Sequence, residues 1–333
     1  MGVSKDKLAK AKESIFKRSK EPKAEVTIKG YDFSKTFDLK KFIDAYAATG
    51  FQATHFAKAV ELTKKMRDAR KNGLRLFLGY TSNMVSSGVR EAILHVVKNN
   101  QVDVIVTTAG GIEEDIIKCL KPFVLGDFRA KGAPLREQGI NRIGNIFVPN
   151  DRYGAFEDFL TPILKELVAE QKKSGKICSP SEIIKILGER INNEESIYYW
   201  AAKHHIPVFC PALTDGSIGD IMFFFKYNQP ELKLDILEDT FRLNNLAIDA
   251  KETGALIIGA GLVKHQICNA NMFREGLKYA VYINTAMEYD GSDSGAEPEE
   301  AISWGKIGAK AEHVKVVGDA TILFPLLVAA AFK

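Results

Sequence analysis

Short apolar runs alternate along the chain with longer segments whose apolar residues recur at helical spacing. The runs predict buried strands, and a helical pattern follows each one; after the first it is carried by Val89, Ile93 and Val96. Repeated strand-then-helix units predict an α/β fold, a Rossmann-like parallel sheet with helices on both faces. The predicted strands cover residues 75–80, 102–107, 205–209, 255–258, 279–284 and 314–317, and further helices are expected from Ser86, over 151–173 and from Ser179.

The predicted domain organisation is one large domain over residues 25–333, because neither an internal repeat nor a low-complexity linker interrupts the pattern. Residues 1–24 differ in composition. Up to Lys23 they carry eight Lys or Arg against three acids, with a thin apolar stripe of Leu8, Ala11 and Ile15. This pattern predicts a marginal basic helix that needs a surface to pack on.

Charge and composition exclude several classes of protein. A net charge of +4 over 333 residues is too weak and too mixed to indicate nucleic-acid binding. The longest apolar run, residues 322–332, is about half of the roughly 20 residues that cross a bilayer, so no membrane span is expected. No signal-peptide pattern opens the sequence, and we expect a cytoplasmic protein. The four cysteines are widely separated, which predicts neither a zinc site nor a disulfide framework.

Small, hydroxyl-bearing and acidic residues follow four of the predicted strands. Ser82 and Asn83 follow the first, Thr108 to Gly110 the second, Gly259 to Gly261 another and Asp319 the last. In a parallel sheet these positions meet at the carboxyl edge, where ligands bind. Each segment alone is typical of a turn, and none is the G-x-G-x-x-G fingerprint. The four together predict a nucleotide site.

The segment 288–306 is unusual in its charge. Six carboxylates occur between Glu288 and Glu300 without a Lys or Arg, and Trp304 and Lys306 follow. Carboxylates and an aromatic face suit a polyamine, and a lysine beside them is able to form an imine. The alternative is a solvated acidic loop before a helix.

The chain resembles the deoxyhypusine synthase family from about residue 30 to 332. The resemblance is carried by LGYTSNMVSSGVRE at Leu78, VTTAGGIEEDIIKCL at Val106, PALTDGSIGD at Pro211, KHQICNAN at Lys264 and AVYINTAMEYDGSDSGAEPEEAISWGKI at Ala280. It implies an NAD-dependent enzyme that oxidises spermidine, releases 1,3-diaminopropane and holds the aminobutyl group as an imine on a lysine. That group then passes to one lysine of the translation factor 5A precursor, and the resulting imine is reduced to deoxyhypusine.

The resemblance also assigns residues. It implies that Lys306 forms the imine, and the chemistry of an imidazole suits His265 for taking the amine proton. The NAD contacts fall on Ser82, Asn83, Ser86, Thr108, Ala109, Gly110, Glu114, Asp215, Gly259, Ala260, Thr285, Ala286, Asp290, Asp319 and Ala320. The polyamine contacts fall on Glu113, Asp220, His265, Asn269, Gly291, Ser292, Asp293, Glu300 and Trp304, and no metal site is expected.

The resemblance further implies a homotetramer with active sites between paired subunits, and an N-terminal helix over a neighbouring subunit's site. One departure is Ala260, which replaces the middle glycine of the family's triplet and puts the NAD affinity in doubt. The rival functions are homospermidine synthesis with putrescine as acceptor, a non-catalytic regulatory subunit and a plain NAD dehydrogenase. Ile267 and Asn271 match the deoxyhypusine-forming pattern, Lys306 argues against the subunit, and the dehydrogenase leaves the acidic loop unexplained.

Overall fold

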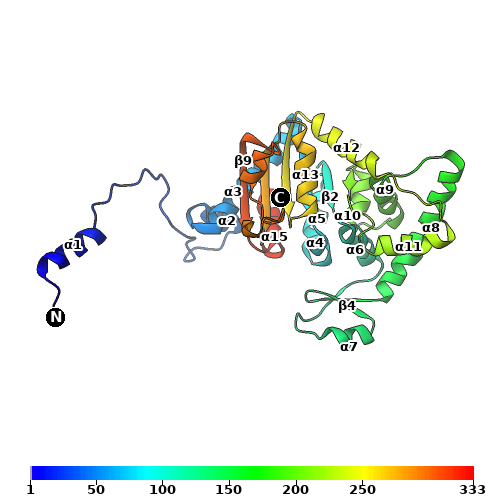
Figure 1. The fold of residues 1–333 in the computed structure, drawn as a ribbon, viewed down its shortest axis with the longest axis horizontal. Helices are drawn as coiled ribbons and strands as arrows, with labels where there is room; N and C mark the ends of the chain where they lie inside the picture. The colour runs from blue at the N-terminus through cyan, green and yellow to red at the C-terminus, as the bar shows by residue number, and fades with distance from the viewer. Residues whose placement is uncertain (1) are drawn as a thin grey trace.

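A twisted parallel sheet of six strands lies at the centre of the computed structural model, which describes residues 2–333 (Figure 1). Every pair of neighbouring strands is parallel, and helices cover both faces, so the predicted fold class is confirmed. In spatial order the strands are β6 (Val208–Phe209), β2 (Val104–Thr107), β1 (Leu74–Tyr80), β7 (Glu252–Ile258), β8 (Leu277–Asn284) and β9 (Ile307–Val317).

Alternate residues of each strand enter different cores, because successive side chains of a strand point to opposite faces. On β1, Leu76 and Leu78 join the larger cluster, which α3, α5 and α15 cover, whereas Phe77 joins a smaller cluster under α12 and α13. The strands are therefore apolar on both faces, as the sequence predicts. These helices are α3 (Phe51–Ala69), α5 (Val89–Lys98), α12 (Ile236–Ile248), α13 (Leu262–Met272) and α15 (Ala320–Ala331).

The remaining helices connect the strands or extend the larger core. They are α2 (Leu39–Ala45), α4 (Ser82–Ser86), α6 (Ala109–Leu120), α8 (Asp151–Ser174), α9 (Pro180–Ile191), α10 (Ile197–Lys203), α11 (Ser217–Asn228) and α14 (Pro298–Ser303), with short 3₁₀ turns at Tyr46–Ala48, Arg70–Asn72 and Glu288–Asp290. The helix expected at Ser179 begins with a complete capping box between Ser179 and Glu182.

Several predicted boundaries are wrong, and the strand expected over 314–317 already begins at Ile307. The helix expected from Ser86 begins at Val89, because the short helix α4 ends at Ser86 and the extended backbone of Ser87 separates it from α5. The strand expected from His205 begins at Val208 instead. His205 has a left-handed φ of 57°, and the Ile206 N–H bonds to the Ala201 carbonyl, so these residues close α10 rather than open β6.

A small antiparallel sheet, absent from the sequence prediction, protrudes below the main sheet in Figure 1. It consists of β3 (Val124–Leu125), β4 (Ile140–Ile143) and β5 (Ile146–Pro149), and α7 (Gly132–Glu137) precedes β4. Among residues 2–333, no helix combines the length and hydrophobicity needed to cross a bilayer.

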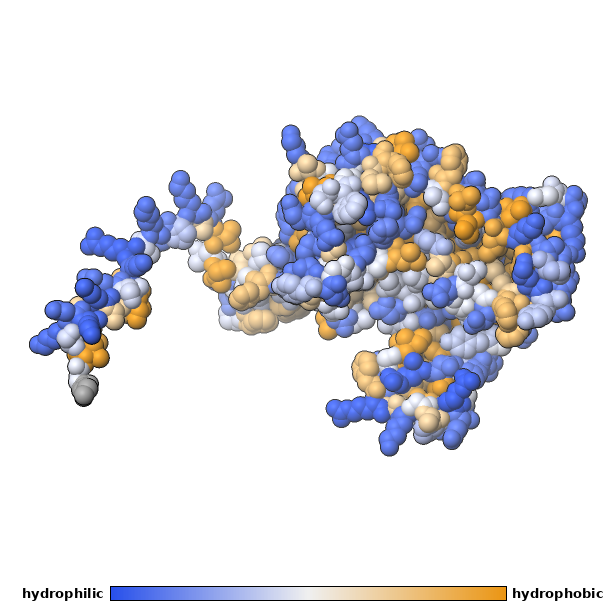
Figure 2. All heavy atoms as spheres, viewed as in Figure 1, coloured by the Kyte–Doolittle hydropathy of each residue, from blue (hydrophilic) through white to orange (hydrophobic). Residues whose placement is uncertain are grey.

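The basic N-terminal segment forms the expected helix, α1 (Lys5–Ile15), capped by Ser4. Figure 1 shows it standing apart from the body of the chain, and none of its residues is buried. Its apolar residues Leu8 and Ile15 are exposed, and Figure 2 shows orange residues among the polar side chains of this segment. The surface that it needs is therefore not supplied by its own chain, and its expected position over a neighbouring subunit's site stays a prediction.

Candidate active site

The carboxyl ends of the six strands lie in one row. Tyr80, the last residue of β1, pairs with Thr107 on one side and Ile258 on the other, and Asn284 pairs with Val317. From β1 the chain first adds β2 and β6 on one side, and later adds β7, β8 and β9 on the other. The strand order therefore reverses between β1 and β7, which is where open α/β sheets form ligand crevices.

The loops after β1 and β7 approach each other closely at this reversal. A Cβ placed on Gly259 would lie 2.3 Å from Thr81 Oγ1, and Gly259 has a φ of +81°. Only glycine fits such a position without a shift of its neighbour. The sequence prediction placed Gly259 in the nucleotide site, and the structure sets it directly beside the first strand's loop.

The loops after β1 and β2 are joined in the same way. Thr108 Oγ1 accepts a hydrogen bond of 3.0 Å from the Ser82 N–H, and a Cβ on Gly110 would lie 2.7 Å from Ser82 Cβ. Ser82 and the first turn of α6 thus form one continuous backbone surface. At this surface small residues leave room for a ligand against the backbone, which suits a phosphate or ribose.

Two buried carboxylates of α6 lie behind this surface. Burial raises the pKa of Glu114 to about 8; a hydrogen bond from Ser86 Oγ opposes the shift, and the neighbouring Glu113 adds to it. Burial also raises the pKa of Glu113, although this carboxylate accepts a 2.9 Å hydrogen bond from the Ile218 N–H. Ser86 and Glu114, predicted separately, therefore form one hydrogen-bonded pair.

The other assigned nucleotide residues continue the row. The Ala286 N–H bonds to Asn284 Oδ1 at 3.1 Å, and Asp319 Oδ1 caps α15 by accepting from the Thr321 N–H at 2.8 Å. The hydrogen bonds from Ser292 lower the pKa of Asp290. Ala260 lies in the loop between β7 and α13, and Thr285 directly follows β8. Ala320 begins α15, and Asp215 is exposed in the loop between β6 and α11.

The acidic segment after β8 is held by two buried lysines that the sequence analysis missed. Lys315 Nζ donates to the Gly295 carbonyl at 2.6 Å and lies 2.9 Å from Glu297 Oε1. Lys264 Nζ donates to the Ala296 carbonyl at 3.0 Å and lies 3.8 Å from Asp293 Oδ2. Buried lysines are rare unless they are paired. The lysines of KHQICNAN and of the strand AEHVKVV were therefore a usable sequence signal for two paired, buried cations.

The helix α13 connects this segment to Lys306. His265 and Asn269, one turn apart on α13, are partly exposed, whereas Cys268 is buried. Burial raises the pKa of the Cys268 thiol, and both Lys264 and Lys306 oppose this shift, so both ammonium groups lie close enough to act on the thiol. Burial lowers the pKa of Lys264, and the negative charge of Glu300 opposes this shift. His265 thus lies on α13, Asp293 of the acidic segment contacts the preceding residue Lys264, and Glu300 and Lys306 follow on α14 and before β9.

Lys306 does not lie at the carboxyl edge. It immediately precedes β9, whose first residue Ile307 pairs with Leu277 at the start of β8. Its Nζ is 5.5 Å from the ring centroid of Trp304, and Trp304 is 64% exposed. The amine and the indole therefore form an accessible cation–π pair at the amino end of the sheet.

The assigned polyamine residues fall into two groups in one chain. Asp220 and Glu113 line a cavity of about 480 Å³ between α6, α8 and α11, together with Asn141, Tyr153 and Phe224. Within residues 2–333, no hydrogen bond or ion pair joins this group to the second group, which lies on α13 and in the segment between β8 and β9: His265, Asn269, Gly291, Ser292, Asp293, Glu300 and Trp304. Sequence reasoning gave no indication of this separation.

Three comparisons with known proteins identify relatives. A family model described as deoxyhypusine synthase matches residues 41–331. A probable deoxyhypusine synthase of Drosophila melanogaster is 52% identical over 97% of this chain and 93% of its own length. One from Methanocaldococcus jannaschii is 54% identical over 91% of this chain and 94% of its own. A crystal structure of a putative deoxyhypusine synthase from Entamoeba histolytica superposes with a TM-score of 0.67 at 31% identity, covering 92% of this chain and 96% of that one.

Proposed function

The chain belongs to the deoxyhypusine synthase family, and from this premise we propose which of its residues carry out aminobutyl transfer from spermidine to the translation factor 5A precursor. It is a transferase of hypusine biosynthesis. The observation that carries the residue assignment is that Asp293 of the acidic segment lies 3.8 Å from Lys264, next to His265 on α13, and that the same segment leads to Lys306 beside the ring of Trp304.

The row of strand ends fits NAD as the cofactor. Gly110 and Gly259 let the loops after β1, β2 and β7 approach one another closely, and Ser82, Thr108 and Glu114 offer polar groups at the same surface. When bound, NAD supplies the hydride acceptor for the oxidation and the hydride donor for the final reduction. We assign its contacts to this surface, to the 259–261 loop and to the ends of β8 and β9.

Residues of the chain bind and orient the polyamine. Asp293 and Glu300 offer negative charge to its ammonium groups, and Trp304 offers an aromatic face to its methylenes or to a cation. Oxidation at a carbon beside the secondary amine requires that amine to lose its proton, and His265 on α13 takes it. The substrate carbon then becomes an imine carbon.

Lys306 carries the aminobutyl group between donor and acceptor. Its neutral amine attacks the imine carbon, and breaking the original C–N bond releases 1,3-diaminopropane. The group remains as an imine on Lys306 Nζ until the acceptor lysine attacks the same carbon and displaces Lys306. Lys306 is thus regenerated as a free amine at the end of each transfer. Trp304, 5.5 Å away, covers this amine.

The two separated groups of polyamine residues support a site shared between subunits. Large apolar side chains lie exposed, as Phe224 in the lining of the first group's cavity and Phe241 on α12, which packs on α13, and Figure 2 shows apolar residues over α12. Exposed apolar patches of this kind mark protein interfaces. We therefore propose a homotetramer in which paired subunits complete each other's sites. Since the acceptor is a translation factor, we propose that the enzyme acts in the cytoplasm.

The rival functions are not favoured. The relatives reported above are named for deoxyhypusine synthesis, not for homospermidine synthesis. Ile267 and Asn271, which favoured the same conclusion, are fully buried in α13, so they act through packing and not by touching an acceptor. A non-catalytic subunit would be expected to lose the lysine, and Lys306 is present.

A direct assay tests the proposed function. The purified chain is incubated with NAD and spermidine labelled in its aminobutyl part, with either the factor precursor or putrescine as acceptor. We expect label on the precursor as deoxyhypusine and little on putrescine. Label that enters only homospermidine would contradict the proposal, as would NADH formation without transfer to either acceptor.

A further inference from the structure

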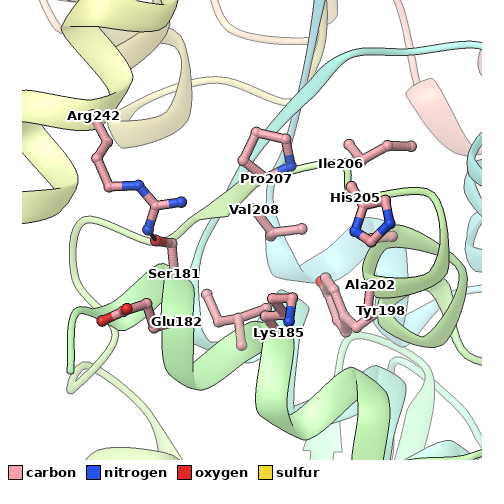
Figure 3. A pocket seen from close by; sticks show the side chains of 12 residues that line it. Ser181, Glu182, Lys185, Tyr198, Ala202, His205, Ile206, Pro207, Val208 and Arg242 are labelled. Atoms are coloured by element: carbon pink, nitrogen blue, oxygen red, sulfur yellow. Dashed lines mark hydrogen bonds between the residues drawn. The ribbon is translucent and has the colours of Figure 1, made fainter.

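A second cavity, of about 220 Å³, lies between α9, α10, α12 and the start of β6 (Figure 3). Val208, the first residue of β6, forms part of its wall, so the cavity lies at the amino end of this edge strand. The nucleotide residues lie at the carboxyl ends of the strands, and Lys306 lies before β9 at the other edge of the sheet. None of the residues assigned to the reaction lines this cavity.

Arg242 contributes a guanidinium with free donors to the cavity. Its Nη1 donates to Ser181 Oγ at 2.9 Å, and this is its only hydrogen bond within residues 2–333. Ser181 Oγ in turn donates to Asp239 Oδ1 at 2.5 Å, which fixes the serine. The guanidinium is thus positioned by one N–H, and its remaining N–H groups are available to a ligand.

His205 faces Arg242 from the opposite side of the cavity. Figure 3 shows Arg242 entering from α12 and His205 from the connection between α10 and β6. The left-handed backbone of His205 and the 2.8 Å bond from the Ile206 N–H to the Ala201 carbonyl fix the position of this connection. Within the described part of the chain, the His205 ring makes no hydrogen bond, so it too is available.

The acidic group in the wall is already neutralised. Glu182 accepts from the Ser179 N–H at 3.0 Å and pairs with Lys176 at 2.9 Å. Burial acts to raise the pKa of Glu182, but the bonds from Lys176 and Ser179 outweigh it and the pKa is lowered. The first N–H groups of α9 are also occupied, since the Ser181 N–H donates to Asp239. Arg242 and His205 are therefore the groups left for a ligand.

The rest of the wall is apolar. It includes Ile184, Tyr198, Ala201, Pro207 and Val208. The Tyr198 hydroxyl donates to the Gly111 carbonyl at 2.6 Å, so Tyr198 offers its ring and not its hydroxyl to the cavity. An apolar protein cavity of about 150 Å³ holds one benzene molecule. A volume of about 220 Å³ has room for one ring and a short acidic side chain.

We propose that this cavity binds a compact carboxylate with an apolar ring, its carboxylate held between Arg242 and His205 and its ring packed on Tyr198 and Val208. Guanidinium and carboxylate match in geometry and form charge-assisted hydrogen bonds. Within the described residues Arg242 forms no ion pair, whereas Lys185 pairs with Glu189 at 2.7 Å, so Arg242 makes the wall favour an anion over a cationic polyamine. The site is independent of the transfer reaction.

Calorimetric titration of the full chain with phenylacetate tests this site without any need for NAD or spermidine. We expect saturable binding with a stoichiometry of one per chain, and phenylacetamide, the neutral analogue, should bind at least about tenfold more weakly. Arg242→Gln should weaken phenylacetate binding by about tenfold or more. Arg190→Gln is the matched control, because Arg190 is an exposed arginine on α9 that pairs with Glu166 outside the cavity.

A second variant keeps the test decisive if Arg242→Gln does not fold. Ala202 lines the cavity, and Ala202→Met adds volume there without removing the bond between Arg242 and Ser181. This variant should abolish phenylacetate binding while circular dichroism remains that of the parent. Parental affinity in Ala202→Met, equal affinities for phenylacetate and phenylacetamide, or no saturable binding to the parent would each overturn the proposal.

Discussion

The buried ammonium of Lys315 donates a 2.6 Å hydrogen bond to the Gly295 carbonyl and so fixes the backbone of the acidic segment to β9. The same ammonium pairs with Glu297 at 2.9 Å. Lys264 repeats this arrangement one residue later, on the Ala296 carbonyl. The acidic segment is therefore not a loosely solvated loop, because two buried cations on different elements determine where its carboxylates lie.

Replacing Lys315 by methionine should disturb the polyamine site and spare the nucleotide site. The variant loses both contacts to the segment 295–297, so spermidine KM should rise by about tenfold or more, as expected for a lost charge-assisted bond. NAD affinity, measured by fluorescence titration, should change by less than about twofold. Lys310→Met, at an exposed position of the same strand, is the control. An unchanged spermidine KM in Lys315→Met would contradict the role given to Lys315.

The raised pKa of Glu114 predicts how stability depends on pH. The folded state keeps the proton up to a pKa of about 8, whereas an ordinary glutamic acid loses it near 4.5. Between these values the folded chain binds more protons than the unfolded chain, so the free energy of unfolding falls as the pH rises from about 4.5 to about 8. Denaturant unfolding at several pH values should show this decline, and Glu114→Gln should reduce its slope. An identical slope in the variant would show that Glu114 ionises normally.

Asp220→Asn tests the cavity between α6, α8 and α11. A charge-assisted hydrogen bond to a carboxylate contributes about 1.5–3 kcal/mol, so its loss should weaken spermidine binding by one to two decades. NAD binding should hardly change. Asp158→Asn, at an exposed position on α8 outside the cavity, provides the matched control. Equal losses for spermidine and NAD would indicate misfolding or an incorrect site.

The separation of the polyamine residues into two groups predicts a multimer. Sedimentation should show a species near four times 36.9 kDa. Phe241→Glu places a charge on the exposed apolar surface of α12, where Phe241 is 65% exposed, and should shift the protein to smaller species with loss of transfer activity. A monomeric Phe241→Glu variant that retains full activity would show that one chain holds a complete site.

Local pattern predicted the parallel sheet because every central strand is buried on both faces, and such strands are apolar throughout. The short strand β6 was misplaced since the sequence does not show that His205 adopts a left-handed φ. The antiparallel sheet of β3, β4 and β5 was missed because its strands are short and largely exposed, and hydrophobic periodicity carries little signal there.

The candidate site was predictable residue by residue but not in its arrangement. Gly259 and Ser82 were correctly expected at the sheet's carboxyl edge, because parallel strands place their ends together. Lys306 immediately precedes β9 at the amino end of the sheet, and the sequence does not show that α14 separates it from Asp293 in this way. A lysine within a buried segment indicated that Lys264 and Lys315 are paired, but their partners are main-chain carbonyls far along the chain, which the sequence does not identify.

Borohydride trapping on Lys306 tests the central assignment most directly. The enzyme is incubated with NAD and labelled spermidine, reduced, digested and analysed by mass spectrometry. We predict an aminobutyl adduct on Lys306, none in Lys306→Ala, and an undiminished adduct in Lys310→Ala, whose lysine lies four residues further along β9. Lys306→Ala should still form NADH from spermidine, because oxidation precedes the imine on the enzyme. An adduct on another lysine, or full transfer activity in Lys306→Ala, would contradict the account.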